Sequence, residues 1–370
     1  MTGNWQFAVN EMLIMLGWLA GWVVMGLAPR RIPSGYRHTK EKVSIIIPAR
    51  NEAQRLPSLL ESLKPLPADW EVIVADDHSS DDTIAVSRSL GAKVIVTPPL
   101  PSGWQGKAWA CWHGAQNATG EWLVFLDADL IISPTQIMQL LNHLYKGPSL
   151  YQKEAATVQP WHHVRSFPEQ FSAWFNVMVW LGTSSLSSPR KGGFGPSLIV
   201  AKDAYFLVGG HQSVASCILE NHQLTRLLSS QSVKVHNFLG DQNWQFRMHH
   251  HQFRSVIRGW GKHFIAGARS APIARLLLTI LWITGFCAEL FGLFFHVHDE
   301  LTTLLLLLGF VFQVALAFRK VGSFRWYTII ISPIMLMFFF AVFLWSLLFR
   351  RRAQVWKDRN LSLPRKVMRP

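Results

Sequence analysis

Two stretches decide the fold: Val43-Ser-Ile-Ile-Ile-Pro-Ala-Arg-Asn-Glu52 and Trp122-Leu-Val-Phe-Leu-Asp-Ala-Asp129. Each begins with a short run of apolar and β-branched residues and stops abruptly at polar residues. Such runs, without alternation, are typical of parallel strands that are covered on both faces. Two more, Glu71-Val-Ile-Val-Ala-Asp76 and Ala92-Lys-Val-Ile-Val96, lie between them. With helical patterns between the runs, we predict an α/β fold with a mostly parallel sheet.

Acidic residues follow two of these predicted strands, at Asp76-Asp77 and at Asp127-Ala-Asp129. In an open α/β sheet the ligand lies at the carboxyl ends of the strands. Carboxylate oxygens are the ligands that Mg²⁺ and Mn²⁺ prefer. We therefore predict a nucleotide and metal site at this edge. For Asp77 an alternative stays open, as a cap of the helix that should begin near Asp82.

The composition combines a net charge of +14 with a mean hydropathy of +0.18. The basic residues cluster beside apolar stretches, for example at Arg30-Arg31, Arg319-Lys320 and Arg350-Arg351-Arg352. Positive charge is typical of the cytoplasmic flanks of membrane helices. We therefore expect a membrane protein and no nucleic-acid partner. The cysteines have no metal-binding spacing and suit a reduced compartment: Cys111, Cys217 and Cys287.

Apolar stretches at both ends of the chain predict membrane segments around one soluble domain. Residues 8–28 are followed, not preceded, by basic residues, which favours a retained membrane anchor over a secretory signal. The predicted order continues with a cytoplasmic domain over 40–270, membrane segments over 273–349 and a basic tail over 350–370. The last apolar stretch, 326–349, has basic residues on both sides, so a span, a re-entrant hairpin and an in-plane helix all stay open.

Residues 167–181 are apolar with polar residues on one side. Glu169, Gln170 and Asn176 favour an interfacial amphipathic helix over a further membrane span.

Residues 43–129 resemble the nucleotide-sugar half of inverting family 2 glycosyltransferases, with Pro48-Ala-x-Asn-Glu52, Asp76-Asp-x-Ser79 and Asp127-Ala-Asp129. Further motifs resemble the membrane-bound branch that glycosylates carotenoid acids. This branch contains the 4,4'-diaponeurosporenoate glycosyltransferases, and hopanoid-associated transferases are more distant. These motifs are Pro101-Ser-Gly-Trp-Gln-Gly-Lys107, Gln159-Pro-Trp-His162, Glu169-Gln-Phe-Ser-Ala-Trp-Phe-Asn176 and Arg258-Gly-Trp-Gly-Lys262. The resemblance implies a GT-A (Rossmann-like) domain with a nucleotide-sugar half over 43–130 and an acceptor half over 131–270.

The resemblance also implies roles for individual residues. The nucleotide-sugar pocket would contain Pro48, Ala49, Asn51, Glu52, Asp76, Asp77, Lys107, Asp127 and Ala128. Asp129 would bind the Mg²⁺ or Mn²⁺ ion, and Asp127 would face the ribose and the sugar. Such a site would offset the negative charge that develops on a nucleoside diphosphate leaving group.

One position departs from the family pattern. Where relatives commonly have Glu-Asp with the aspartate as general base, this chain has Glu220-Asn221. Either Glu220 is the base or none is needed. A hydroxyl acceptor must lose a proton as it attacks, whereas a carboxylic acid with a pKa near ~4 arrives ionised. We therefore expect a carboxylate acceptor and a glycosyl ester product.

Six residues of the acceptor half are candidates for contact with the acceptor or the diphosphate. They are Gln170, Gly193, Arg254, Arg258, Trp260 and Lys262. For the basic residues among them, a role as membrane-surface charge stays open. Gln-x-x-Arg-Trp, which is frequent in processive relatives, is absent, so we expect transfer of a single sugar.

The resemblance implies a multi-pass enzyme of the cell membrane with its catalytic domain in the cytoplasm. It would transfer a sugar, glucose, from a UDP-sugar to an isoprenoid lipid, the carboxylate of a C30 apocarotenoid acid. Transfer to another lipid hydroxyl or to a polyprenyl phosphate is an alternative. A non-catalytic membrane scaffold that retains the nucleotide-binding fold is an alternative of another class. Nothing in the sequence indicates the oligomeric state.

Overall fold

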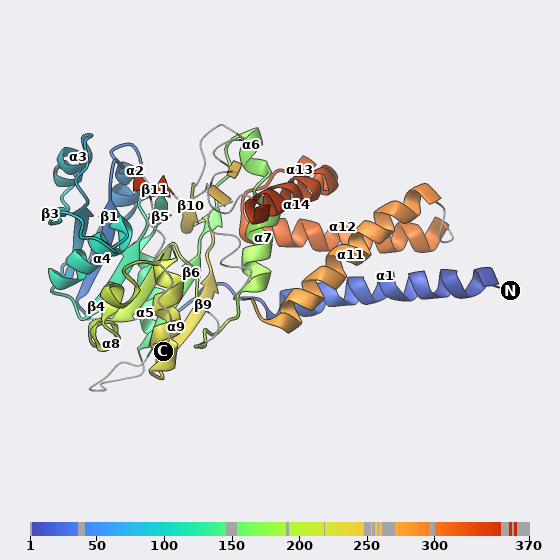
Figure 1. Cartoon of the computed structure of the whole chain (residues 1–370), viewed down its shortest axis with the longest axis horizontal. Helices are drawn as coiled ribbons and strands as arrows, with labels where there is room; N and C mark the ends of the chain where they lie inside the picture. Colours follow the sequence, from blue (N-terminus) through green and yellow to red (C-terminus); the bar gives the residue numbers. More distant parts are fainter. Residues whose placement is uncertain are drawn as a thin grey trace. The chain divides into compact units, whose positions relative to one another are not determined.

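The structure is a computed structural model (Figure 1). It describes residues 2–35, 41–145, 154–189, 192–217, 219–247, 253, 256–257, 259–260, 271–295, 300–348, 355–356 and 359–360. The chain forms two compact units. The sheet unit contains residues 30–163, 185–248 and 348–370, and the helical unit contains residues 1–29, 164–184 and 249–347.

The sheet unit is built on a seven-stranded sheet with the order β3-β2-β1-β4-β8-β6-β9. Its strands are β1 (Val43–Ala49), β2 (Trp70–Asp76), β3 (Lys93–Val96), β4 (Trp122–Leu126), β6 (Glu154–Gln159), β8 (Ser197–Ala201) and β9 (Lys234–Leu239). Only β8 runs antiparallel to its neighbours, β4 and β6, so the prediction of a mostly parallel sheet is confirmed. The four apolar runs of the nucleotide half form β1 to β4, and β1 and β4 are buried throughout.

The helices of the sheet unit follow the strands, as the alternating pattern predicts. They are α2 (Leu56–Ser62), α3 (Thr83–Ser89), α4 (Gly106–Gln116), α5 (Pro134–Leu144), α8 (Lys202–Leu207), the 3₁₀ helix η1 (Gly210–Val214) and α9 (Glu220–Ser230). A small second sheet has the order β5 (Leu130–Ile132), β10 (Trp244–Phe246) and β7 (Trp161–His162). A two-stranded pair, β11 (Val355–Trp356) and β12 (Arg359–Asn360), completes the unit.

Gly120 occupies a crowded position at the entrance to β4. Its N–H donates to Ser44 Oγ at 2.8 Å, and Ser44 Oγ donates to Glu71 Oε1 at 2.6 Å. A Cβ at residue 120 would stand 2.5 Å from the backbone nitrogen of Ser44. The turn therefore requires a residue without a side chain.

We expect Gly120→Ala to lower the free energy of unfolding by about 1–3 kcal/mol, because backbone atoms must move to admit the methyl group. Thermal unfolding of the purified protein measures this. Gly35→Ala is the matched control, since a Cβ there meets nothing within 4 Å. Equal midpoints for the two variants would contradict the expectation.

The helical unit contains α1 (Thr2–Leu27), α6 (Phe167–Gln170), α7 (Ala173–Gly182), α11 (Ile273–Phe295), α12 (Glu300–Val321), α13 (Tyr327–Ile330) and α14 (Ser332–Leu348). Among the described residues, two helical stretches are long and apolar enough to cross a membrane, Ile273–Gly292 and Glu300–Val321. Two shorter apolar stretches are Glu11–Leu27 and Ser332–Leu348. A span needs about 20 apolar residues, so α14, with 17 residues, is short for one.

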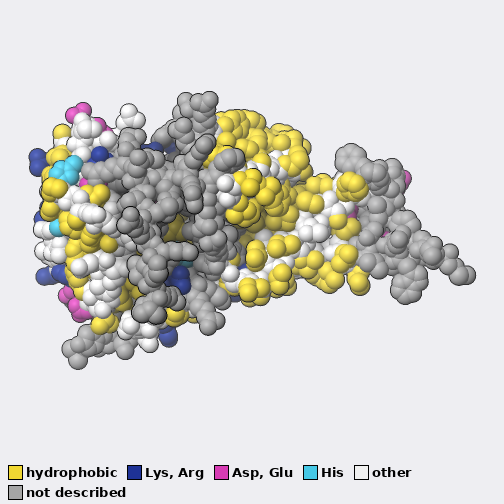
Figure 2. Space-filling view, viewed as in Figure 1, with side chains coloured by type: hydrophobic (Ala, Val, Ile, Leu, Met, Phe, Trp, Pro, Cys, Tyr) yellow, Lys and Arg dark blue, Asp and Glu magenta, His cyan; other side chains and the backbone are white. Residues whose placement is uncertain are grey.

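Apolar side chains gather on the surface of the helical unit (Figure 2). On α12 the exposed residues recur at helical spacing: Leu301, Leu304, Leu305, Leu308 and Phe312. On α11 they are Ile273, Leu276, Leu277, Ile280 and Phe291. Apolar stripes of this size are typical of surfaces that are covered by lipid or by another protein.

Helix α1 is an integral part of the helical unit. It crosses α11 so closely that a Cβ on Gly17 would stand 2.8 Å from the Cα atom of Gly285. The Gln313 side chain of α12 donates to Trp18 O at 2.8 Å and accepts from Trp282 Nε1 at 2.8 Å. Small residues and buried polar side chains are typical contacts between membrane helices.

The segment that suggested an interfacial helix forms α6 and α7. Most of α7 is buried, and Asn176 is 1% exposed and donates from Nδ2 to Ser172 O in its own helix. Gln170 is also 1% exposed. Among the apolar residues of these two helices, Phe167 at the start of α6 is largely exposed. The polar residues of this segment therefore face partners within the helical unit.

Candidate active site

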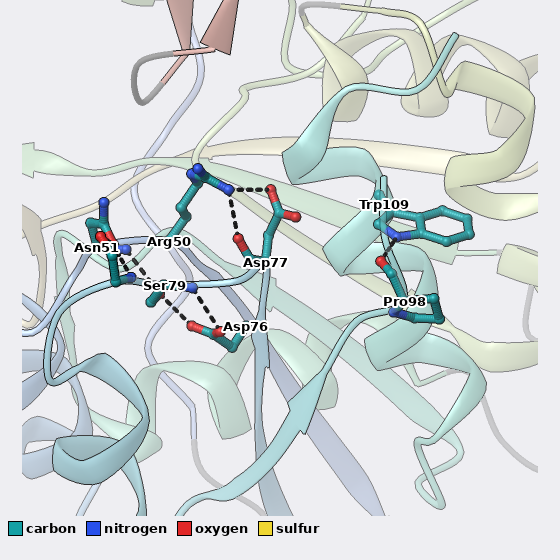
Figure 3. Close-up of polar contacts among 8 residues, drawn as sticks. Arg50, Asn51, Asp76, Asp77, Ser79, Pro98 and Trp109 are labelled. Carbon is teal, nitrogen blue, oxygen red and sulfur yellow. Dashed lines mark hydrogen bonds and ion pairs between the residues drawn. The ribbon is translucent and has the colours of Figure 1, made fainter. Parts of the chain in front are cut away.

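The loops that follow β1 and β2 are bound to each other by polar contacts (Figure 3). Asn51 has a positive φ of 52°, and its N–H donates to Ser79 Oγ at 3.0 Å. The N–H of Ser80 donates to Asn51 Oδ1 at 2.8 Å. The carboxylate of Asp76 accepts from the N–H of Ser79 at 3.0 Å and also from its hydroxyl. Asn51 and Asp76, which come from different motifs, thus lie in one ordered pair of loops.

Arg50 connects the same two loops on the other side. Its Nη1 donates to Asp77 O at 2.8 Å and lies 3.6 Å from Asp77 Oδ2 (Figure 3). Asp77 is fully buried, and its N–H donates to Ala49 O at 2.9 Å. At the first turn of α3, Asp81 Oδ1 accepts a hydrogen bond from the N–H of Thr83 at 3.1 Å. Pro48 and Ala49 are the last two residues of β1, directly before this cluster.

The loop before α4 is also held in place. Trp109 Nε1 donates to Pro98 O at 2.9 Å (Figure 3), and Gln105 N–H donates to Ala215 O at 2.7 Å. These contacts fix the start of α4, whose second residue is Lys107.

Lys107 joins two carboxylates from different parts of the chain. Its Nζ lies 2.6 Å from Asp127 Oδ1 and 2.7 Å from Glu220 Oε1. Asp127 follows β4, and Glu220 is the first residue of α9. The sequence predicted each of the three residues, and the structure brings them together around one ammonium group.

The charges in this cluster shift one another's pKa values. Burial would lower the pKa of Lys107, but the Asp127 and Glu220 carboxylates outweigh it and raise that pKa. Burial would raise the pKa of Glu220, but Lys107 outweighs it and lowers that pKa. For Asp127, burial dominates over Lys107, and with Asp129 and Glu220 nearby its pKa rises to about 7. Lys107 is therefore charged and Glu220 ionised at neutral pH.

Asp129 and Ala128 complete the predicted motif. Burial raises the pKa of Asp129, against the charge of Arg55, while Glu52 adds to the rise. Arg55 Nη1 lies 3.2 Å from Glu52 Oε2. The backbone oxygen of Asp129 accepts from Arg247 N–H at 3.2 Å.

The surroundings of Asp129 fit a divalent cation that takes most of its ligands from the substrate. Within the described part of the chain, no ion pair holds the Asp129 carboxylate, and no group of three or more His, Cys, Asp and Glu side chains is placed to form a cage. Mg²⁺ characteristically binds through one or two carboxylates together with substrate phosphates. Asp129 would supply the protein carboxylate of such a site.

A buried histidine that the sequence did not identify as functional lies behind the cluster. His211 Nε2 lies 3.3 Å from Asn221 Oδ1, and His211 Nδ1 lies 2.9 Å from Tyr205 Oη. Asn221 Nδ2 donates to Gly195 O at 2.7 Å. In the sequence, His211 was only the residue after the Gly209-Gly210 turn. No local pattern indicates that it contacts Asn221.

The glycine-rich segment at 192–195 packs against α9. Gly193 N–H donates to Thr225 Oγ1 at 2.8 Å, and Gly193 O lies 3.0 Å from His222 Nδ1. A Cβ at Gly193 would stand 2.6 Å from Thr157 Oγ1, whereas a Cβ at Gly195 would meet nothing within 4 Å. Gly193, a predicted acceptor residue, thus has packing reasons to be glycine, and Gly195 borders open space.

The remaining candidates lie outside the sheet unit. Gln170 Oε1 accepts from Thr328 Oγ1 at 2.7 Å and from Arg325 N–H at 3.2 Å, and Trp260 stacks on Phe175 with ring centroids 5.2 Å apart. All these contacts are within the helical unit. Three predicted residues lie outside the described residues: Arg254, Arg258 and Lys262.

Among curated proteins, the chain is 29% identical to a 4,4'-diaponeurosporenoate glycosyltransferase from Staphylococcus aureus (strain MRSA252). The match extends over 372 residues and covers 97% of this chain and 99% of that protein. The enzyme of the same name from strain USA300 has the same identity and coverage.

Among solved structures, the chain is similar to the mannosyltransferase PcManGT from Pyrobaculum calidifontis, in complex with GDP-Man and Mn²⁺. The TM-score is 0.49 at 17% identity, with 93% of this chain and 97% of that chain covered. Glucosyl-3-phosphoglycerate synthase from Mycobacterium tuberculosis, in complex with Mn²⁺, uridine diphosphate and glucosyl-3-phosphoglycerate, gives a TM-score of 0.40 at 17% identity. This match covers 66% of this chain and 88% of that chain. Likeness at this level says nothing about the substrates of this chain.

Residues 44–177 match the family model described as Glycosyl transferase family 2. These residues contain β1 to β4, both acidic motifs, and Lys107 with its partner Asp127. The chain therefore contains a glycosyl transferase family 2 domain, and its sheet unit has an α/β fold with a mostly parallel sheet.

Proposed function

We propose that the protein transfers glucose from UDP-glucose, with inversion, to the carboxylate of an isoprenoid lipid, a C30 apocarotenoid acid. The observation that carries the proposal is the Lys107 cluster. Lys107 lies between Asp127 and Glu220 there, and Asn221 occupies the sequence position where relatives commonly have the general base. The name of the S. aureus relative supports an apocarotenoid acid as the acceptor.

The two bound loops and Asp127 would hold the donor. Asn51, Asp76 and Asp77 lie around the carboxyl ends of β1 and β2, where the uridine would sit against Ala49 and Glu52. Asp127 would contact the ribose and the sugar, and Lys107 would approach the diphosphate. Mg²⁺ or Mn²⁺ on Asp129 would neutralise charge on the leaving diphosphate.

The transfer itself needs no proton to be moved if the acceptor is a carboxylate. A carboxylate oxygen attacks the anomeric carbon from the face opposite the diphosphate, the new C–O bond forms, and the bond to the UDP oxygen breaks. UDP leaves with the electron pair, beside the charge of Lys107. Glu220 is a weak base here, because Lys107 lowers its pKa and lies 2.7 Å from its Oε1. Its role is then to hold Lys107.

The helical unit would bind the membrane and bring the protein to its lipid acceptor. The candidate spans in α11 and α12 have exposed apolar stripes. Arg319 and Lys320 lie in the last turn of α12, which favours a cytoplasmic end for that helix. We place the protein in the cell membrane as a multi-pass enzyme with its sheet unit in the cytoplasm.

Transfer of labelled glucose from UDP-glucose into the lipid fraction of membranes that carry the protein tests the proposal. The expected product is metal-dependent and is released by mild alkali, as a glycosyl ester is. Labelled lipid that resists alkali would indicate that the acceptor group is a hydroxyl and that Glu220 is the general base. If no lipid is labelled with 4,4'-diaponeurosporenoate and any of the UDP-sugars supplied, the alternative of a non-catalytic membrane scaffold would be favoured.

We expect Asn221→Asp to leave the transfer rate unchanged or to lower it. The amide of Asn221 donates to Gly195 O at 2.7 Å, and a carboxylate there would place two acceptors against each other. Initial rates with the acid acceptor measure this. Asn117→Asp, on the exposed end of α4, is the control for added charge. A tenfold or larger gain in Asn221→Asp would show that a base was missing, and would contradict the carboxylate acceptor.

A further inference from the structure

A continuous chain of hydrogen bonds runs through the protein interior behind Glu220. It connects Tyr205 of α8, His211 of η1, Asn221 of α9 and the carbonyl of Gly195. Tyr205 and His211 are fully buried, and Asn221 is 2% exposed. Buried polar groups without partners are costly, and here each group has one.

The hydrogen bonds fix the direction of the donors between Gly195 and His211. Gly195 O can only accept, so Asn221 Nδ2 donates to it and Asn221 Oδ1 faces His211 Nε2. Nε2 therefore carries a proton and donates to Asn221 Oδ1 at 3.3 Å. Tyr205 Oη accepts from the backbone N–H of His211 at 3.0 Å and lies 2.9 Å from His211 Nδ1. When the ring is neutral, Nδ1 accepts the hydroxyl hydrogen of Tyr205.

The electrostatic surroundings keep the imidazole neutral. Burial lowers the pKa of His211 to about 4, with Lys107 adding to this shift and Glu220 and the bond to Asn221 opposing it. At neutral pH the ring therefore acts as one donor and one acceptor.

This chain of hydrogen bonds connects the two segments that carry the carboxylates around Lys107. Asn221 directly follows Glu220 in the first turn of α9. Gly195, the acceptor of the Asn221 amide, precedes Pro196, whose oxygen accepts from the N–H of Asp127 at 3.0 Å. Asn221 therefore connects the start of α9 to the end of β4. These are the two segments that carry the partners of Lys107.

We propose that His211 is a positioning residue of the transfer reaction: by orienting Asn221, it keeps Glu220 and Asp127 at the spacing that holds Lys107. The kinetic part of this inference rests on the proposed function. Without the imidazole, the Asn221 amide can rotate away from Gly195, and the two segments lose their connection. A displacement of about 1 Å in a reacting geometry can lower a rate about 100-fold.

The test uses the full-length protein and four variants. His211→Phe keeps a ring but removes both side-chain bonds, and His211→Gln keeps an N–H that can reach Asn221. Asn221→Ala and the double variant His211→Phe/Asn221→Ala complete a mutant cycle. His236→Phe is the matched control, since His236 lies on β9 and pairs with Glu154 of β6 at 3.1 Å.

Two measurements are made on each variant. Hydrogen exchange of segments 192–197 and 219–226 reports the connection without any substrate. It is expected to be faster in both segments of His211→Phe and unchanged in His236→Phe. In His211→Phe, the kcat of transfer from UDP-glucose to 4,4'-diaponeurosporenoate is expected to fall about 10–100-fold. The KM for UDP-glucose is expected to stay nearly unchanged.

The cycle separates positioning from general stability. If His211 acts through Asn221, the double variant is no slower than Asn221→Ala, and His211→Gln recovers part of the rate. The inference would be overturned if the two substitutions lowered the transfer rate independently, so that their fold losses multiplied in the double variant. Unchanged hydrogen exchange in His211→Phe would also overturn it. If the wild type transfers no sugar, the proposed function fails, and the exchange measurement alone decides whether His211 holds the two segments together.

Discussion

Asp129→Ala is expected to reduce metal-dependent sugar transfer by about 10²–10³-fold, the cost of losing one charge-stabilising group at the reacting centre. Asp129 follows β4 by three residues, beside Glu52, Arg55 and Lys107. The described residues offer no cluster of three acidic, histidine or cysteine side chains that would replace it as a metal ligand. The ion would then be held by the diphosphate alone, and the leaving group would lose part of its charge neutralisation.

Initial rates across a range of Mn²⁺ and Mg²⁺ concentrations measure this effect. Asp82→Ala is the matched control, because Asp82 is exposed at the N-cap of α3 and makes no capping hydrogen bond with its side chain. The control is expected to keep the metal dependence of the wild type. An Asp129→Ala enzyme with wild-type rate and metal dependence would remove Asp129 from the site.

Lys107→Met is expected to be the most damaging single change, lowering both stability and transfer. The ammonium group lies 2.6 Å from Asp127 and 2.7 Å from Glu220, and Glu220 is 5% exposed. Removing one partner of a buried ion pair lowers the free energy of unfolding by about 3–5 kcal/mol, because the other charge remains without compensation. Loss of the cation also removes charge stabilisation beside the leaving diphosphate, worth about 10²–10³-fold in rate.

Thermal unfolding and transfer rates are measured together for Lys107→Met. Lys93→Met is the matched control, since Lys93 is half exposed and lies 3.8 Å from Glu71, and exposed pairs contribute about 0–1 kcal/mol. The double variant Lys107→Met/Glu220→Gln is expected to regain part of the stability but none of the transfer. If Lys107→Met is as stable and active as Lys93→Met, the cluster has no role in either.

The sequence was sufficient for the nucleotide half of the fold, because its signals are local. Four apolar runs became β1 to β4, and the acids that follow β2 and β4 mark the ends of parallel strands. The register of β1 and β2, with Ala49 opposite Asp76, brings the polar loops together as expected for neighbouring parallel strands.

The contacts between distant residues could not be predicted in the same way. No periodicity indicates that Glu220 in α9 meets Lys107 in α4, or that His211 orients Asn221. Such contacts depend on how η1, α9 and the loop before β8 pack in three dimensions. The site residues were identified by resemblance, and their arrangement came only from the structure.

Polar residues in the segment 167–181 suggested a side that faces water. In the structure Asn176 bonds to Ser172 O within its own helix, and Glu169 completes a capping box with Ser166. Gln170 accepts from Thr328. A polar residue satisfied within the protein leaves the same sequence pattern as one in water, so amphipathicity alone did not distinguish the two.

The most direct test of a carboxylate acceptor compares two lipids that differ in one group: an apocarotenoid acid and the alcohol obtained by reducing it. Both are offered with labelled UDP-glucose and Mn²⁺ to the wild-type protein in membranes. The account predicts transfer to the acid alone, with an alkali-labile product, because Asn221 provides no base and Glu220 is held by Lys107. Faster transfer to the alcohol, with an alkali-stable product, would contradict it.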